Sequence, residues 1–108
     1  MNIQDMFGKM QQLQQQMEDA RKRLADLRVE AEAGGGMVRV TATGARQVLK
    51  IQLDDEVVQD REMMEDLICA AVNKALDLAD QLAKEEMGKA TAGMLPNMPG
   101  MDLSRFGL

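Results

Sequence analysis

The chain has no His, Trp or Tyr, and only two Phe and one Cys among its 108 residues. The lack of His removes the commonest general base, proton shuttle and metal ligand. Cys69 cannot form a disulfide within the chain, and no His is present to activate it as a nucleophile. Core volume must come from aliphatic side chains and eleven Met. We therefore expect no enzyme activity, no cofactor, no metal site and no small-molecule substrate.

Long apolar runs and a secretion signal are also missing. The longest apolar run extends from Leu67 to Val72, which is too short to cross a bilayer. The first twelve residues lack the order of charged and then apolar residues that is typical of a signal peptide. With no disulfide either, the sequence predicts a reduced, cytoplasmic protein without a membrane partner.

The chain is short and acidic overall, with a net charge of -5. A chain of this length buries only about 60 to 68% of the surface that its unfolded form exposes, so we expect one domain that oligomerises. The acid is concentrated in residues 51–66, which hold seven acidic side chains and one basic one. Residues 1–28 hold five basic and four acidic side chains, so this part of the chain can still contact phosphate.

The first segment has the pattern of a helix with a narrow apolar seam. Its apolar residues follow one another in steps of three and four: Ile3, Met6, Met10, Leu13, Met17, Ala20, Leu24 and Leu27. The charged positions that flank this seam are all basic: Lys9, Arg21, Arg23 and Arg28. A parallel pair of such helices would bring cation against cation, so the seam should meet a different partner.

Two partners for this basic flank stay open from the residues alone. One is the acidic final helix, through Glu65, Asp66, Asp77 or Asp80. The other is a nucleic-acid backbone, because phosphate contacts require only positioned cations and no base-reading motif. The cations that would face it are Lys9, Arg21, Lys22, Arg23 and Arg28.

Three segments then alternate apolar and polar residues, which predicts strands over 27–33, 37–43 and 46–53. Gly34, Gly35 and Gly36 allow a tight reversal between the first two, and Gly44 with Ala45 turns the chain into the third. The glycine run lacks the Lys-Ser/Thr continuation of a phosphate loop. We expect an antiparallel meander whose aliphatic face needs a cover.

The acidic segment 54–60 is expected to be a connection, and Asp60 is a good N-cap for a long helix. Apolar residues between Met64 and Ala83 cover an arc of about 200° on this helix, wider than one contact needs. The helix should therefore cover the sheet and also meet a second helix, and the excess apolar surface predicts a dimer. Gly93, Pro96, Pro99 and Gly100 end the pattern.

The residues after this helix have no apolar periodicity, so we expect a flexible tail over 93–108 after a single domain over 1–92. Deleting residues 94–108 should leave the melting temperature nearly unchanged. A loss of many degrees would instead mean that Leu103, Phe106 or Leu108 docks on the folded part.

Several motifs, in this order and spacing, resemble the YbaB/EbfC family of bacterial nucleoid-associated proteins. They are MFGKMQQLQQQM at 6–17, GGGMVRVTATG at 34–44, IQLDDE at 51–56, MMEDLICAAVNKAL at 63–76 and GMLPNMPGM at 93–101. The resemblance covers nearly the whole chain.

This resemblance implies an α+β subunit made of a helix, a three-stranded antiparallel sheet and a long helix, which pairs into a tweezer-shaped homodimer. It implies a nucleoid-associated protein that binds double-stranded DNA with limited sequence preference, alters its conformation and contributes to nucleoid organisation and gene regulation. The candidate contacts are Lys9, Arg21, Lys22, Arg23 and Arg28, with Lys74, Lys84 and Lys89 of the final helix as further candidates.

A binding module of another class is the alternative interpretation. A prefoldin-like chaperone or coiled-coil adaptor also joins two helices through β-hairpins and holds protein partners on flexible, Met-rich apolar surface. Its helical arms would need to be longer than the roughly 25 residues available here.

Overall fold

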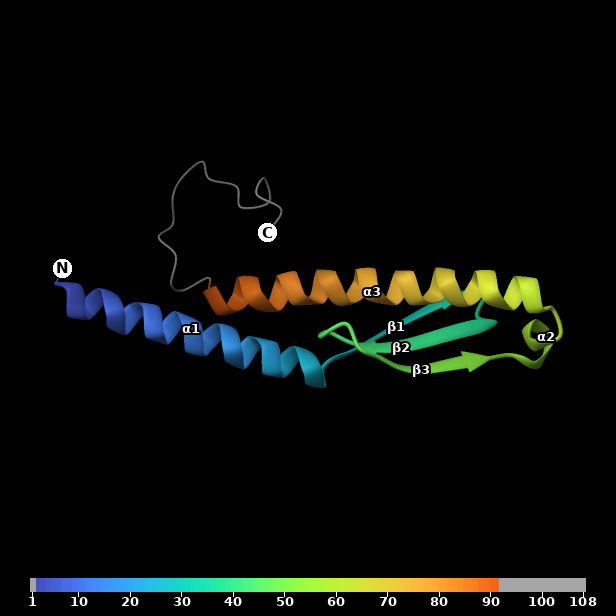
Figure 1. The fold of residues 1–108 in the computed structure, drawn as a ribbon, viewed down its shortest axis with the longest axis horizontal. Helices are drawn as coiled ribbons and strands as arrows, with labels where there is room; N and C mark the ends of the chain where they lie inside the picture. Colours follow the sequence, from blue (N-terminus) through green and yellow to red (C-terminus); the bar gives the residue numbers. More distant parts are fainter. Residues whose placement is uncertain (1, 92–108) are drawn as a thin grey trace, which may run out of the picture.

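The computed structural model describes residues 2–91, which form an elongated, flat molecule with principal extents of 67 × 28 × 15 Å (Figure 1). The elements in chain order are α1 (Ile3–Asp26), β1 (Arg28–Ala33), β2 (Val38–Thr43), β3 (Val48–Leu53), α2 (Asp55–Val58) and α3 (Arg61–Thr91). This order confirms the predicted α+β class. The expectation of a flexible tail over 93–108 lies outside the described residues.

Local capping sets the ends of the helices. The Asn2 side chain accepts a hydrogen bond from the Asp5 backbone nitrogen at 3.0 Å and so caps α1. At the other end of α1, Leu27 is extended, and its backbone nitrogen donates to the carbonyl oxygens of Arg23 and Leu24. Asp60 caps α3 as predicted, since its Oδ1 accepts from the Met63 nitrogen at 3.1 Å.

The three strands form an antiparallel sheet in the order β1-β2-β3. Val40 lies opposite Ala31 on one side and Ile51 on the other, which puts all three on the inner face of the sheet. The register shifts after Thr41, which pairs with Lys50, so that Ala42 pairs with Val48. The extra residue in β3 forms a bulge beside the turn that joins β2 to β3.

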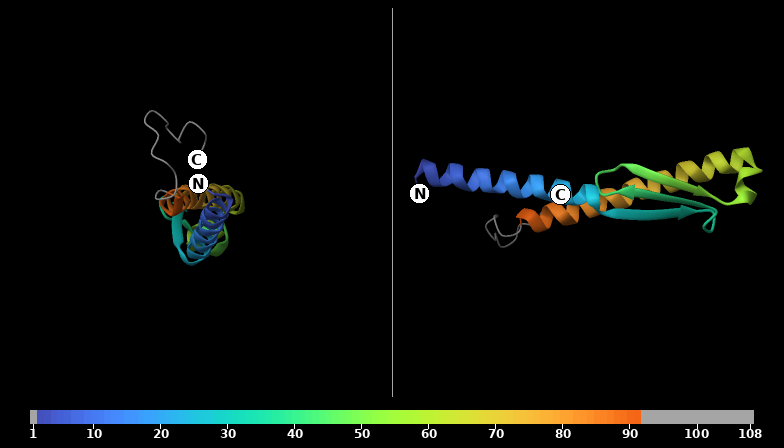
Figure 2. Two further views of the ribbon diagram at one scale, coloured as in Figure 1. Left: turned by 90° about the vertical axis from the view of Figure 1, so that its left-hand side faces the viewer. Right: turned by 90° about the horizontal axis from the view of Figure 1, so that it is seen from below.

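Helix α3 covers the inner face of β1 and β2 but not that of β3 (Figure 2). Small side chains permit this close packing, because Ala71 and Ala75 are completely buried against the sheet. The sequence analysis treated residues 54–60 as a connection only, and this was incomplete. They include the short helix α2, whose Val57 is fully buried in the same core.

Helix α1 packs antiparallel on the C-terminal part of α3, within the same chain (Figure 1). Ala20 and Leu24 of its seam are buried in this contact. The first turns of α1 carry four large apolar side chains that are 53 to 71% exposed: Ile3, Met6, Phe7 and Met10. The apolar seam of α1 is therefore buried against α3 near the sheet and exposed near the N-terminus.

The glycine run between β1 and β2 gives a prediction with an internal control. Gly34 and Gly35 have φ of 64° and 67°, and a Cβ at Gly34 would also lie 2.6 Å from Cδ1 of Leu67, whereas one at Gly35 would meet nothing within 4 Å. Gly35→Ala should cost about 1 to 2 kcal/mol of unfolding free energy through backbone strain alone. Gly34→Ala should cost about 1 kcal/mol more, since Leu67 must move. Equal losses in urea unfolding at one chain concentration would contradict this assignment.

Candidate nucleic-acid interface

The cations of the first helix lie on an arm that projects from the rest of the molecule (Figure 1). We define the arm as α1 together with residues 79–91 of α3, and the body as the sheet, α2 and residues 61–78 of α3. The arm is held together by the packing of α1 on α3. Seven of the eight candidate cations lie on the arm or at its root. Six are on the arm, namely Lys9, Arg21, Lys22, Arg23, Lys84 and Lys89, and Arg28 lies at its root as the first residue of β1.

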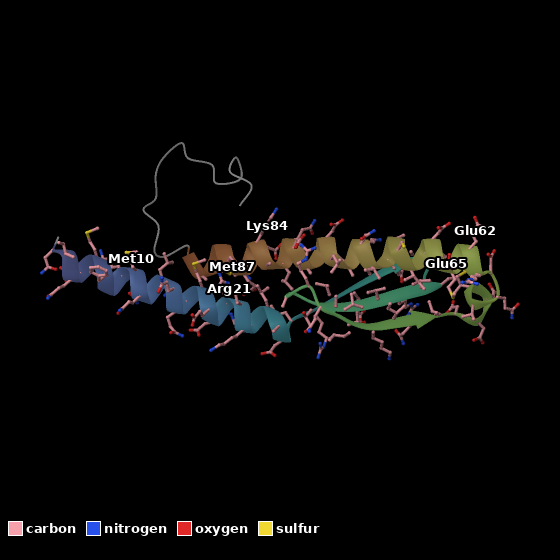
Figure 3. The ribbon with its side chains drawn as sticks, viewed as in Figure 1. Met10, Arg21, Glu62, Glu65, Lys84 and Met87 are labelled. Atoms are coloured by element: carbon pink, nitrogen blue, oxygen red, sulfur yellow. The ribbon has the colours of Figure 1, made fainter. Side chains whose placement is uncertain are left out.

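Four of these cations are exposed and make no ion pair with any described residue: Arg21, Lys22, Arg28 and Lys84. Arg21 lies on the stretch of α1 that runs beside α3, and Lys84 lies on the side of α3 away from α1 (Figure 3). Such side chains keep their full charge available for an external anion. They are the cations best placed to contact phosphate.

Two other candidates meet a carboxylate of their own chain. Nε of Arg23 lies 3.7 Å from Oε2 of Glu86, and Nζ of Lys89 lies 3.5 Å from its Oε1. The Glu86 side chain is only 15% exposed, so this small cluster is partly withdrawn from water. The expectation that the basic flank meets the final helix is thus confirmed for Arg23.

The acid that Arg23 meets is not one of the four that the sequence analysis named. Glu65 pairs with Arg61 one turn earlier in its own helix, with Nε and Oε1 3.1 Å apart. Asp80 accepts from Arg46 at 2.8 Å. Periodicity identified the apolar faces of α1 and α3. Which charged side chains meet depends on the axial offset between the two packed helices, and this offset is set by side-chain packing.

The remaining two candidates lie apart from these cations. Lys9 lies near the bare end of α1, among its exposed apolar residues. Lys74 lies on the body, where it lines a shallow polar depression with Glu30, Glu32 and Arg39. Two carboxylates beside Lys74 oppose the approach of an anion, so the structure does not group it with the arm.

Two further cations of the sheet, Arg39 and Lys50, were not among the candidates predicted from the sequence. Arg39 and Lys50 lie on its outer face, as their alternation with inner residues indicates. Nε of Arg39 lies 3.8 Å from Oε2 of Glu32 on the neighbouring strand. Lys50 is exposed, with no ion pair among residues 2–91.

The densest group of acidic residues lies at the opposite end of the molecule from the N-terminus of α1, although the arm also carries acidic residues: Asp5, Glu18, Asp19, Asp26, Asp80, Glu85 and Glu86. Helix α2 lies at the far end of the body, where α3 also begins (Figure 1). The acidic residues at this end are Asp54, just before α2, Asp55 and Glu56 in α2, and Asp60 and Glu62 at the start of α3. A polyanion would be repelled from this end and approach the arm more readily. The acidic segment that the sequence indicates at residues 51–66 is therefore also separated in space from the arm.

Sites for chemistry were sought among the same residues. Within residues 2–91, no three side chains of His, Cys, Asp or Glu come together in a way that could hold a metal ion. Cys69 is an exposed, free thiol on α3. None of the helices within residues 2–91 combines the length and the apolar character needed to span a bilayer.

Comparison with known proteins addresses the resemblance directly. The model of the YbaB/EbfC DNA-binding family matches residues 1–94. The chain is 48% identical over 103 residues to a nucleoid-associated protein of Xanthomonas campestris, covering 94% of this chain and 95% of that one. It is 46% identical over 94 residues to a nucleoid-associated protein of Chlorobium phaeobacteroides, covering 87% and 85%.

A solved structure has the same fold. The crystal structure of an uncharacterized protein from Helicobacter pylori matches with a TM-score of 0.72 at 22% identity, over 79% of this chain and 91% of that one. On the match to its family model and on its identity to these relatives, the chain belongs to the YbaB/EbfC DNA-binding family.

Proposed function

We propose that this protein binds double-stranded DNA as a homodimer, through cations of the arm that contact the phosphate backbone. The observation that carries the proposal is a set of exposed cations without an ion pair among residues 2–91, namely Arg21 and Lys22 on the arm and Arg28 at its root, remote from the acidic end of the body. Membership of a DNA-binding family supports it.

An open apolar face supports the homodimer. Inner-face residues of β3 are not covered by α3, and Val48, Ile51 and Leu53 remain 38 to 43% exposed in the single chain. Ile51 lies directly beside the fully buried Val40 in the sheet register. Apolar surface continuous with a core is typical of a subunit interface, and a second copy of the chain would bury it.

Backbone contacts account for a limited sequence preference. Arg and Lys bound to phosphate fix the position of a protein on a duplex without reading its bases. Two arms of one dimer would hold DNA at two places, which gives a means of altering its conformation. On this basis we propose a role in nucleoid organisation and gene regulation, which agrees with the names of the nucleoid-associated relatives.

A salt titration of duplex binding tests the proposal. Each phosphate neutralised contributes about 0.9 to the slope of log affinity against log salt, so a dimer with two or three phosphate contacts per arm should give a slope of roughly -4 to -5. Gel shifts of duplexes with unrelated sequences should give similar slopes and affinities. Binding that is insensitive to salt, or confined to one sequence, would contradict backbone recognition by the arm.

The bare end of α1 favours a second candidate function. Its exposed Ile3, Met6, Phe7 and Met10 offer flexible apolar surface of the kind that chaperones use to hold unfolded proteins. A prefoldin-like activity predicts that the protein suppresses the aggregation of an unfolding client at stoichiometric amounts. Suppression without duplex binding would favour this alternative over DNA association.

A further inference from the structure

The turn between β2 and β3, residues 44–47, lies where the body meets the arm (Figure 1). Its first residue, Gly44, is buried, and its backbone nitrogen donates to the carbonyl oxygen of Leu27 at 3.0 Å. A Cβ at Gly44 would lie 2.8 Å from Cδ2 of Leu24, 3.0 Å from the Leu24 carbonyl oxygen and 3.2 Å from Cδ2 of Leu82. One glycine is therefore in close contact with both helices of the arm.

The rest of the turn is fixed to the body and to α3. Oγ1 of Thr43 accepts from the backbone nitrogens of Ala45 and Gln47 at 3.2 and 3.3 Å, and only 3% of Thr43 is exposed. Arg46 is the one non-glycine residue with a positive φ, 66°, within the described part of the chain. Its Nη1 donates to both carboxylate oxygens of Asp80, at 2.8 and 3.1 Å.

Helix α1 acts as a lever on this contact. It extends about 32 Å from Leu24 to Ile3, so a rotation of about 10° at the turn displaces its far end by roughly 5 Å. That displacement exceeds the axial spacing of about 3.4 Å between successive phosphates of one DNA strand. The same rotation moves Lys9, about 22 Å along the helix from Leu24, by about 4 Å, whereas Arg21 and Lys22 lie next to the pivot and move by less than about 1 Å. A small change in packing at Gly44 would therefore move Lys9, but not Arg21 or Lys22, out of register with a duplex.

We propose that Gly44 is a positioning residue for the DNA contact. By lacking a Cβ, it lets the end of α1 approach α3 at the angle that places the N-terminal half of α1, with Lys9, for phosphate binding, while the Arg46 to Asp80 ion pair holds the turn in place. The proposal rests on the proposed function, since it concerns how the same arm meets DNA.

The test is Gly44→Ala in a Cys69→Ser background, with nitroxide labels on the exposed positions Gln12 and Gln52. Doubly labelled chains are diluted with excess unlabelled chains, so that the spin-spin distance reports one subunit. Gln12 lies about 18 Å along α1 from Leu24, so we expect the distance between Gln12 and Gln52 to shift by up to about 3 Å. The affinity for duplex DNA should fall about tenfold, although no cation has been removed.

A second substitution separates positioning from stability. Gly44→Ala combined with Leu24→Ala removes the Cδ2 atom that the new Cβ would meet, at the expense of a cavity in the core. The contacts of the new Cβ with the Leu24 carbonyl oxygen and with Cδ2 of Leu82 remain. Positioning therefore predicts that the double variant has a lower melting temperature than Gly44→Ala but moves back toward the parental distance and affinity. If the double variant is less stable and its Gln12–Gln52 distance and its affinity for duplex DNA depart still further from the parental values, the proposal is overturned.

The remaining outcomes are also decisive. An unchanged distance and affinity in folded Gly44→Ala would overturn the proposal. If Gly44→Ala does not fold, Asp80→Asn decides: a broader distance distribution with weaker binding supports the role of the turn, and parental values overturn it. A parent that does not bind duplex DNA would contradict the proposed function, yet the distance would still reveal whether Gly44 sets the angle of the arm.

Discussion

Replacing Arg21, Lys22 and Arg28 with Glu is expected to weaken binding to every duplex sequence by about a hundredfold or more at moderate salt, because up to six phosphate contacts of a dimer become repulsive. These three side chains are exposed and make no ion pair with any described residue, so their reversal should leave the fold intact. Gel shifts at two salt concentrations measure the loss, and circular dichroism with sedimentation verifies folding and association.

A matched control carries the same change in net charge on the body. Arg39, Lys50 and Lys74 are exposed side chains outside the arm, and their replacement with Glu should weaken binding only through the general field. Arg23→Ala provides a second comparison, since it removes the contact with Glu86 and tests the packing of α1 on α3. If the arm variant stays folded and binds like the parent while the body variant does not, the contact surface is on the sheet.

Replacing Ile51 with Glu is expected to raise the dimer dissociation constant by at least about a hundredfold, because a buried carboxylate without a partner costs several kcal/mol. Ile51 lies on the open inner face of β3, 43% exposed in the single chain. In a subunit interface the new carboxylate would lose most of its water. Sedimentation velocity at micromolar concentration should change from dimer to monomer, with DNA affinity falling as the second arm is lost.

Gln52→Glu is the control for this experiment. Gln52 is the next residue of the same strand, lies on the opposite face and pairs with Arg39, so the charge change is identical but remains in water. It should leave the dimer intact. A stable, fully folded monomer of the parent protein, or an Ile51→Glu protein that dimerises like the parent, would contradict the proposed interface.

The location of the open face differs from the sequence-based expectation. The wide apolar arc of residues 64–83 predicted that α3 itself would carry the surplus surface. In the structure, Ala71 and Ala79 of this arc are fully buried within the chain, against the sheet and the arm. The uncovered apolar surface lies on β3, because one helix can cover about two strands, and on the first turns of α1, where the apolar seam was also expected to be in excess. A charged residue in place of Ala71 should therefore lower the stability of the fold, and a charged residue in place of Ile51 should weaken the association of two chains.

The sequence alone determined the elements and their order. Steps of three and four from Ile3 to Leu24, alternation in three short segments and the capping residue Asp60 are local signals. Local hydrogen bonding and side-chain period fix helices and strands within a few residues. The short helix α2 was missed because four residues are too few to display a period. The lack of His and the ordered family motifs also limited the function before any tertiary contact was known.

Only the tertiary structure decided which surfaces meet. Arg23 and Glu86 are 63 positions apart in the chain, and that Arg23 faces Glu86 rather than Glu65 depends on the offset between α1 and α3. The two helices meet where Leu24 and Leu82 lie against Gly44. Likewise, every strand of the meander has an apolar face, but the path of α3 leaves β3 open and so defines the face available to a second chain. The packing of side chains from distant parts of the chain determines these contacts. The periodicity of a segment indicates which of its faces is apolar, but not where that face lies along its partner element.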